Sequence, residues 1–322
     1  MNEPRKILKS AAALAAMTGV ALAAGLVPAS AEHASISATG EPGPGTTLAG
    51  CPIFPASNPW NRDISKAPVH PRSSQYIASI GRETGLHPDF GSGRYGDYGI
   101  PFRVVGSNQA KVPVRFTAYG DESDRGPYPI PLGTRIEGGS DNHVIALQKG
   151  TCRLYELYRA RRDGGRWLAD SGARFDLRSN RLRPAGWTSA DAAGLPILPG
   201  LARADEASSG RITHALRVTV SESQRGYIHP ARHFASSSDD RSLPPMGLRL
   251  RLKAGYSLKG LTGQARAIAK AMKKYGLIVA DNGSDWYFSG TPDKRWNDDV
   301  LDQLKEVPGR AFEAVKTGPI HR

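Results

Sequence analysis

The sequence has few of the features by which common classes of protein are recognised. It contains only two cysteines in 322 residues, and its only apolar run approaching the length of a membrane span lies at the N-terminus. Two cysteines cannot build a disulfide-dense scaffold or, by themselves, a structural zinc site. The sequence also has no GxSxG nucleophile elbow, no Walker phosphate loop and no HExxH zinc motif. These absences disfavour the enzyme classes that carry such local signatures.

The N-terminal segment has the organisation of a secretory signal. Basic residues precede an apolar run over residues 11–27, and Ala29-Ser30-Ala31 supplies a small-x-small cleavage site. A retained membrane anchor is the alternative, but the run is only about 17 residues long, rich in Ala and not followed by a positive stop-transfer cluster. We predict a signal peptide over residues 1–31, a flexible Ser/Thr/Gly/Pro-rich leader over residues 32–50 and a single globular β-rich domain over residues 51–316. The mature protein is then secreted.

Export determines what the cysteines and the charge imply. In an oxidising compartment we expect Cys51 and Cys152 to pair. The signal carries three basic residues and one acidic residue, so its removal lowers the net charge from +13 to about +11. This excess favours an extracellular polysaccharide or an anionic wall polymer as partner. The basic residues lack interleaved aromatics, so we expect no nucleic-acid partner. We also expect no membrane span, and a monomer.

The hydrophobic pattern predicts mainly short strands bounded by Gly, Pro, Asn or Asp. Helices are predicted at residues 263–275 and 298–307, and a short helical segment at residues 73–81 within the loop-rich N-terminal stretch. Because strands outnumber helices and do not alternate with them, we predict a mainly β fold, a jelly-roll-like β-sandwich with one or two appended helices and long loops. Asn282-Gly283 between the last two strands predicts a β-hairpin. The predicted strands are residues 102–105, 112–116, 143–147, 153–160, 212–220, 247–254, 278–280 and 286–288.

Four polar residues are candidates for acid–base chemistry. Asp205 and Glu206 lie on a loop that leads to the strand containing His214, and His143 opens another strand. Each histidine shares a strand face with apolar residues, so a role in the core is the alternative to a role in a site. A carboxylate and an imidazole at one cleft act as general acid and base. The candidate catalytic residues are Glu206, Asp205, His214 and His143, on the condition that they converge on one groove.

Four further residues are candidates for substrate binding. Glu156 interrupts an apolar strand, where a carboxylate either faces water or is partnered in a cleft. Trp187 offers a face for a sugar ring, although a tryptophan in a β domain is more often in the core. Arg217 suits a carboxylate or phosphate, with surface charge as the alternative. Asp191 shares a dense loop with Trp187. No spacing of Asp, Glu or His is diagnostic of a metal, and we expect no cofactor.

One run of the sequence is distinctive. Residues 186–196 read Gly-Trp-Thr-Ser-Ala-Asp-Ala-Ala-Gly-Leu-Pro, and Asp205-Glu206, Pro244-Pro245-Met246-Gly247 and Ala280-Asp281-Asn282-Gly283-Ser284 follow. With these segments, the chain from about Cys51 to Val315 resembles a family of secreted, mostly actinobacterial proteins. The resemblance implies export and a single domain, and it supplies no activity or catalytic residues.

Two functions from different classes fit these features. The first is a hydrolase or lyase acting on an extracellular or cell-wall polysaccharide. In a hydrolase, Asp205 or Glu206 would be the acid or nucleophile. In a lyase, His143 or His214 would be the base and Arg217 would neutralise a uronate. The alternative is a non-catalytic protein that binds a glycan or a cell-wall polymer through aromatic and arginine side chains.

Overall fold

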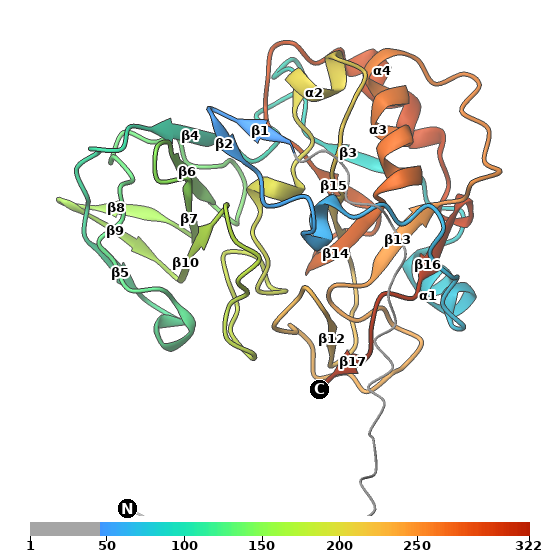
Figure 1. Cartoon of the computed structure of the whole chain (residues 1–322), viewed down its shortest axis with the longest axis horizontal. Coiled ribbons are helices and arrows are strands. Elements are labelled where there is room, and N and C mark those ends of the chain that lie inside the picture. The colour runs from blue at the N-terminus through green and yellow to red at the C-terminus, as the bar shows by residue number, and fades with distance from the viewer. Residues whose placement is uncertain (1–45) are drawn as a thin grey trace, which may run out of the picture. The chain divides into compact units, whose positions relative to one another are not determined.

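The computed structural model describes residues 46–322 (Figure 1). The predicted signal peptide and most of the predicted leader lie outside this part. The end of the predicted leader belongs to the fold, because β1 (Thr47–Leu48) pairs antiparallel with β2 (Cys51–Pro52). The fold also passes residue 316, since β17 (Ile320–His321) pairs with β12 (Tyr227–Ile228). Among residues 46–322, no helix is long and apolar enough to cross a membrane.

A six-stranded mixed sheet forms one layer of the fold. Its strand order is β16-β13-β14-β11-β15-β3. β11 lies inside the sheet, pairing in parallel with β14 and antiparallel with β15, and its Leu216, Val218 and Val220 are fully buried. The strands are β3 His87–Asp89, β11 Leu216–Val220, β13 Arg249–Leu252, β14 Leu277–Asn282, β15 Tyr287–Ser289 and β16 Phe312–Val315.

Two smaller sheets pack face to face as a β-sandwich, drawn in green in Figure 1. The first has the order β10-β7-β6-β4, and the second has the order β5-β9-β8. Their strands are β4 Phe102–Val105, β5 Val114–Phe116, β6 Val144–Gln148, β7 Arg153–Tyr158, β8 Arg161–Asp163, β9 Arg166–Ala169 and β10 Ser171–Asp176. The core between them contains Tyr128, Ile130, Val144, Ala146, Tyr155, Leu157, Ala160, Trp167 and Ala169.

The two inner strands of the four-stranded sheet, β6 and β7, are buried on both faces. Along β6, Val144 and Ala146 belong to the sandwich core, whereas Ile145 and Leu147 belong to the main core, which also contains the strands of the six-stranded sheet. This alternation follows from the period of two along a strand. The four-stranded sheet is therefore a middle layer. The predicted mainly β fold is confirmed, and parallel pairs such as β4 with β6 distinguish it from an all-antiparallel jelly roll.

The three predicted helices are present, together with one short additional helix, α2. α3 begins after Thr262, as its sequence predicts, and Gly276 follows it with a φ of 72°. An alanine at Gly276 would place its Cβ only 2.3 Å from the Leu250 carbonyl oxygen, so this position requires glycine. The predicted helix at residues 298–307 is α4 followed by a 3-10 turn. The helices are α1 Ser73–Ile80, α2 Ala204–Ser208, α3 Gly263–Lys274 and α4 Asp298–Asp302.

The predicted hairpin around Asn282-Gly283 is wrong. The flanking strands β14 and β15 form, but β11 lies between them and pairs with both. Neither Asn282 nor Gly283 has the positive φ that a type I′ hairpin turn requires. The apolar β11 gains more burial between the two strands than a local hairpin would allow, so tertiary packing overrides the turn signal.

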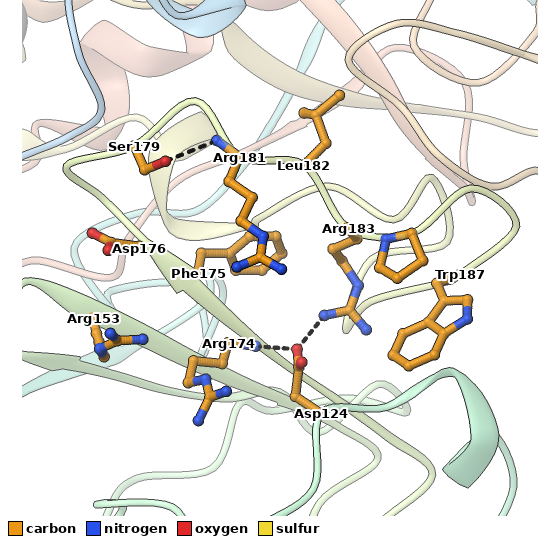
Figure 2. A pocket seen from close by; sticks show the side chains of 11 residues that line it. Asp124, Arg153, Arg174, Phe175, Asp176, Ser179, Arg181, Leu182, Arg183 and Trp187 are labelled. Carbon is orange, nitrogen blue, oxygen red and sulfur yellow. Dashed lines mark hydrogen bonds and ion pairs between the residues drawn. The ribbon is translucent and has the colours of Figure 1, made fainter.

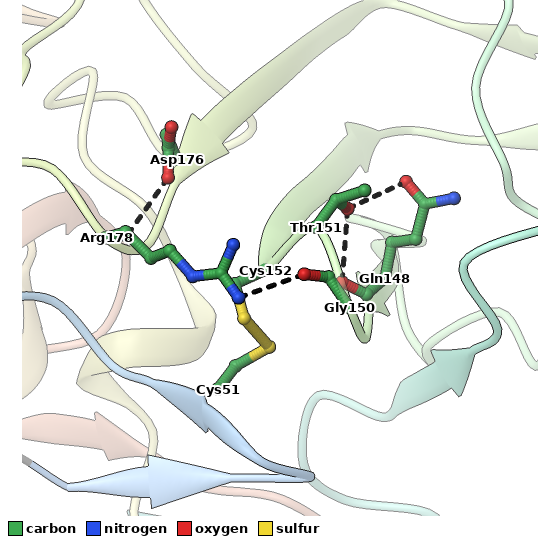
Figure 3. Close-up of a disulfide and its surroundings, with 7 residues drawn as sticks. All are labelled: Cys51, Gln148, Gly150, Thr151, Cys152, Asp176 and Arg178. Carbon is green, nitrogen blue, oxygen red and sulfur yellow. Dashed lines mark hydrogen bonds between the residues drawn. A yellow bond between two sulfur atoms is a disulfide. The ribbon is translucent and has the colours of Figure 1, made fainter.

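The predicted disulfide between Cys51 and Cys152 is confirmed (Figure 3). It joins β2 to the residue before β7, an interior strand of the four-stranded sheet. Both cysteines are buried, and 101 residues separate them in sequence. Beside the bond, Arg178 Nη2 donates to the Gly150 carbonyl at 2.9 Å. The disulfide thus attaches the start of the described chain to the middle layer.

Candidate functional site

Polar side chains form a row across one face of the six-stranded sheet. The strand register places Asp89 of β3 opposite Ser289 of β15. Ser289 Oγ accepts a hydrogen bond from Arg217 Nη1 of β11 at 2.5 Å. Two residues along β11, on the same face, Thr219 lies opposite Asp281 of β14. The row therefore crosses four strands, from β3 to β14.

The middle layer presents polar side chains to the same space. Glu156 and Tyr158 lie two residues apart on β7, and Glu156 is fully buried. The His143 ring, just before β6, lies 5.6 Å from the Tyr158 ring. His143 Nε2 lies 3.0 Å from the Ala190 carbonyl oxygen, and the next residue, Asp191, binds Arg217, so the two sets face each other. The interlayer cluster consists of Asp89, Glu137, His143, Glu156, Asp191, Arg217, Asp281 and Ser289.

The loop after β10 attaches to the six-stranded sheet through two acidic side chains. Asp191, 1% exposed, accepts hydrogen bonds from Arg217 Nε at 3.1 Å and Nη2 at 2.8 Å. This two-point contact is the strong form of a carboxylate–arginine pair. The next residue, Ala192, donates its N–H to Asp281 Oδ2 at 3.2 Å. Burial and the nearby Asp191 carboxylate raise the pKa of Asp281 to about 8, so this side chain is protonated at neutral pH.

The same loop attaches to the middle layer through Glu156. Its carboxylate accepts the backbone N–H groups of Ile197, at 3.0 and 2.9 Å, and of Leu198, at 2.9 Å. Burial raises the pKa of Glu156 to about 7, although the two amides oppose the shift. The carboxyl that interrupts an apolar strand is thus partnered by backbone, and it holds the loop against β7.

Glu137 and His143 form a second charged pair in the cluster. Glu137 accepts from the His143 backbone N–H at 3.0 Å and from His143 Nδ1 at 2.5 Å. Burial opposes the charge of His143, but Glu137 outweighs it and raises its pKa to about 9. Burial likewise opposes the charge of Glu137, and His143 lowers its pKa in return. The charged ring also donates from Nε2 to the Ala190 carbonyl at 3.0 Å, so neither nitrogen is free.

A cavity of about 480 Å³ opens beside Asp89. Tyr95 and Tyr98 line it and are 62% and 55% exposed. A third tyrosine, Tyr287, stacks on His87 with the ring centres 3.9 Å apart. Burial raises the pKa of Asp89, and the charges of Glu137 and Arg217 also act on this carboxyl. Asp89 thus connects the cluster to an accessible, aromatic-lined space.

The loop that carries Glu137 lies against the rim of this cavity. Arg135 forms an ion pair with Asp97, which follows the cavity-lining Gly96. The Gly138 backbone is so close to Asp97 that a Cβ there would lie 3.0 Å from the Asp97 carbonyl oxygen. Glu137 retains 15% side-chain exposure. Asp89 and Glu137 are therefore two carboxyl groups of the cluster with opposite pKa shifts and access to solvent.

The four predicted catalytic residues do not converge. Glu206 and His214 contact each other, with His214 Nε2 3.1 Å from Glu206 Oε2, and Arg203 Nη2 lies 2.9 Å from Glu206 Oε1. His214 is 0% exposed, and its Nδ1 is bonded to the Ala215 carbonyl. His143 lies in the interlayer cluster, and no hydrogen bond or ion pair within residues 46–322 joins it to Glu206.

The remaining predicted catalytic residue, Asp205, lies at the exposed side of this contact and approaches the same Arg203. Its side chain is 46% exposed and lies 3.4 Å from Arg203 Nε. Glu206 is ionised in the folded protein. Burial disfavours its negative charge, but His214 and Arg203 lower the pKa of Glu206 to about 2. An ionised carboxylate that is buried and saturated with partners braces α2 and has no proton to donate. The condition of one shared groove is not met.

The predicted substrate-binding residues are divided between two places. Glu156, Asp191 and Arg217 lie in the interlayer cluster, where each is engaged with protein partners. Trp187 lies elsewhere, half-buried at a cavity rich in arginine. Three carboxyls of the cluster are absent from the sequence-based predictions: Asp89, Glu137 and Asp281. Two of them had a signal, because Asp89 precedes a glycine-rich loop and Asp281 precedes an Asn-Gly pair.

No metal-binding group stands out in this part of the chain. Among residues 46–322, no three His, Cys, Asp or Glu side chains are placed together to hold a metal ion. Comparisons with models of protein families, with curated proteins and with solved structures found no match for the chain.

Proposed function

We propose that this protein is a secreted hydrolase that cleaves a glycosidic bond in an extracellular or cell-wall polysaccharide. Asp89 is the proton donor, and Glu137 is the base that activates water. The observation that carries the proposal is Asp89, a carboxyl of raised pKa in the wall of an aromatic-lined cavity, together with Glu137, a carboxyl of lowered pKa on the loop that pairs with Asp97 beside that cavity. Carboxyls whose environments separate their pKa values are the usual acid and base of glycoside hydrolysis.

The two environments differ for a clear physical reason. Partial burial raises the pKa of Asp89 and so favours its neutral form, which is the form that a proton donor needs. Glu137 is held as a carboxylate by the charged ring of His143. His143 is then a positioning residue, since both of its nitrogens are already bonded. The two pKa shifts are thus in the directions that an acid and a base require.

The cavity favours a sugar over a compact charged substrate. Exposed Tyr95 and Tyr98 and the stacked Tyr287 offer flat apolar faces with polar edges, which suit pyranose rings. A volume of about 480 Å³ accommodates one or two sugar units beside Asp89.

A lyase is less well supported than a hydrolase. Its base would be His143 or His214, but both rings have their two nitrogens bonded and are 3% and 0% exposed. Its uronate-neutralising group would be Arg217, which is engaged with Asp191 and Ser289. No group in this set is free to remove a proton from a sugar carbon or to bind a substrate carboxylate.

The test is turnover of a polysaccharide panel by the purified protein, followed both as new reducing ends and as unsaturated-uronate absorbance. Reducing ends without absorbance are expected. Asp89→Asn and Glu137→Gln should each lower kcat by about 10²-fold or more. The wild-type pH profile should be bell-shaped, and the limb at high pH should disappear in Asp89→Asn, because that limb reports deprotonation of the raised-pKa acid.

Asp302→Asn is the matched control. Asp302 lines the same cavity, but it is half exposed and paired with Lys305, so its variant should keep kcat within about twofold. Full turnover in both the Asp89 and Glu137 variants would refute the assignment of the two carboxyls. Saturable binding of a glycan without any product would instead support a non-catalytic glycan-binding protein.

A further inference from the structure

A second cavity, of about 610 Å³, lies at the edge of the four-stranded sheet and shares no lining residue with the Asp89 cavity. β10, the edge strand, contributes Arg174 and Phe175, and Arg153 comes from β7. The segment after β10 completes the wall with Arg181, Arg183 and Trp187. Figure 2 shows the four arginine side chains standing around one space. We call it the arginine cavity.

The charge of the arginine cavity is unbalanced. Two acidic residues line it, and both are engaged. The Asp124 carboxylate accepts hydrogen bonds from Arg183 Nη1 at 2.5 Å and from the Arg174 backbone N–H at 2.9 Å. The Asp176 carboxylate accepts one from the Arg178 backbone N–H at 3.0 Å. Within residues 46–322, the side chains of Arg153, Arg174 and Arg181 form no hydrogen bond or ion pair. Three guanidinium groups therefore line the space with their donors available.

Arg183 has a different role, because it is fixed in place. Its Nε donates to the Thr188 carbonyl at 2.7 Å and its Nη2 to the Glu122 carbonyl at 2.6 Å. The guanidinium lies 5.6 Å from the Trp187 ring centre and 5.8 Å from the Phe175 ring centre. This contact sets the position of Trp187 before any ligand arrives, so little ordering is required on binding.

Free guanidinium groups beside a fixed tryptophan ring indicate which chemical groups a ligand of this cavity must carry. Arginine binds the oxygens of carboxylate and phosphate in bidentate fashion, and an indole face packs on a sugar ring or a polyol chain. We propose that the arginine cavity binds an anionic unit of a polysaccharide or wall polymer, a saccharide or polyol that carries a carboxylate or phosphate. This inference does not depend on hydrolysis at Asp89, and binding here is measurable without turnover.

Calorimetric titration at low ionic strength tests the site. The probes are tri-galacturonate, a glycerol-phosphate trimer and neutral maltotriose. Both anionic probes are expected to bind more tightly than maltotriose by about tenfold or more, and the tighter of the two identifies the source of the anion. Arg174→Gln with Arg181→Gln should weaken anion binding by about tenfold, and Trp187→Leu should weaken it without changing the charge.

The control removes the same charge elsewhere. Arg161 and Arg211 are exposed, lie outside the cavity and have no side-chain partner within residues 46–322, so their double Gln variant should bind the anions within about twofold of wild type. An equal loss in both double variants would show a general charge effect and overturn the site. Unchanged affinity in the Arg174/Arg181 variant, or equal binding of maltotriose, would also overturn it. Thermal unfolding of each variant confirms that the fold is kept.

Discussion

Replacing Glu206 by glutamine separates a structural brace from a catalytic carboxylate. The Glu206 side chain is 8% exposed and accepts from Arg203 at 2.9 Å and from Thr46 Oγ1, with His214 3.1 Å away. Glutamine keeps the size and one acceptor oxygen but removes the negative charge. Arg203, whose side chain is only 3% exposed, then loses its principal counter-charge.

The magnitude follows from the pKa of Glu206, which is lowered from 4.5 to about 2 in the folded protein. A difference of about 2.5 pKa units between folded and unfolded states corresponds to about 3 kcal/mol of stability at pH 7. Because the folded pKa is depressed, this stability is present above pH 4.5 and is lost as the pH falls towards 2. We expect Glu206→Gln to lower the free energy of unfolding by about 3 kcal/mol at pH 7 and by about 2 kcal/mol at pH 3.5.

Urea unfolding at several pH values between 7 and 3.5 measures the effect. Asp205→Asn is the matched control, since the neighbouring carboxylate is 46% exposed and contacts the same arginine at 3.4 Å. Such a surface pair contributes about 0–1 kcal/mol. The hypothesis that ionised Glu206 stabilises the fold is refuted by either of two results. One is that Glu206→Gln is no less stable than Asp205→Asn, and the other is that its loss in free energy of unfolding does not change with pH. A Glu206→Gln protein that is as stable as wild type but inactive would indicate a catalytic role for Glu206.

Two further predictions concern the disulfide and the partly buried carboxyl of Asp281. Replacing Cys51 and Cys152 by serine should lower the free energy of unfolding by about 4–5 kcal/mol, because the bond closes a loop of about 100 residues. Urea unfolding of the variant and of reduced wild type should agree, and an unchanged midpoint would contradict the estimate. Burial and the nearby Asp191 carboxylate raise the pKa of Asp281 to about 8, so wild type should lose stability as the pH rises from about 4 to about 8. The Asp281→Asn variant should not lose stability over this range, so its stability relative to wild type should rise between pH 5 and pH 9. Thermal unfolding at several pH values measures this difference. Parallel pH profiles for the two proteins would disprove the raised pKa of Asp281.

Local signals in the sequence were sufficient for most elements of the fold. α3 follows Thr262, a residue type favoured just before a helix, and an obligatory glycine comes after it, so its predicted bounds agree with the structure to within one residue. The error at Asn282-Gly283 has a different origin. The sequence records the turn signal but not that β11, more than 60 residues earlier, inserts between the two strands. Pairing between distant strands is set by burial in the completed sheet.

The site was only half predictable for the same reason. His143, Asp191 and Arg217 were chosen by residue type and strand position, and all three lie in the interlayer cluster. Glu206 and His214 satisfied the same criteria and lie in a separate brace. Spacing along the chain brings a carboxylate and an imidazole together in both cases. It does not show which pair remains in contact with a cavity.

The distinctive run over residues 186–196 gains a physical explanation from these contacts. The carbonyl of Ala190 accepts a hydrogen bond from the His143 ring beside the middle layer. The carboxylate of Asp191 accepts a hydrogen bond from Arg217 of the six-stranded sheet. Just beyond it, the Ile197 N–H binds Glu156 of β7. The run is therefore the connection that fixes the distance between the two layers, and none of these groups is free to meet a substrate.

This role predicts how the run should constrain the site. Asp89 lies on the six-stranded sheet and Glu137 is held by His143 at the edge of the middle layer, so their separation depends on the loop between them. A displacement of about 1 Å between an acid and a base is enough to lower a rate by about 10²-fold. In the proposed mechanism Asp191 therefore acts through position alone, because its carboxylate is already bound to Arg217.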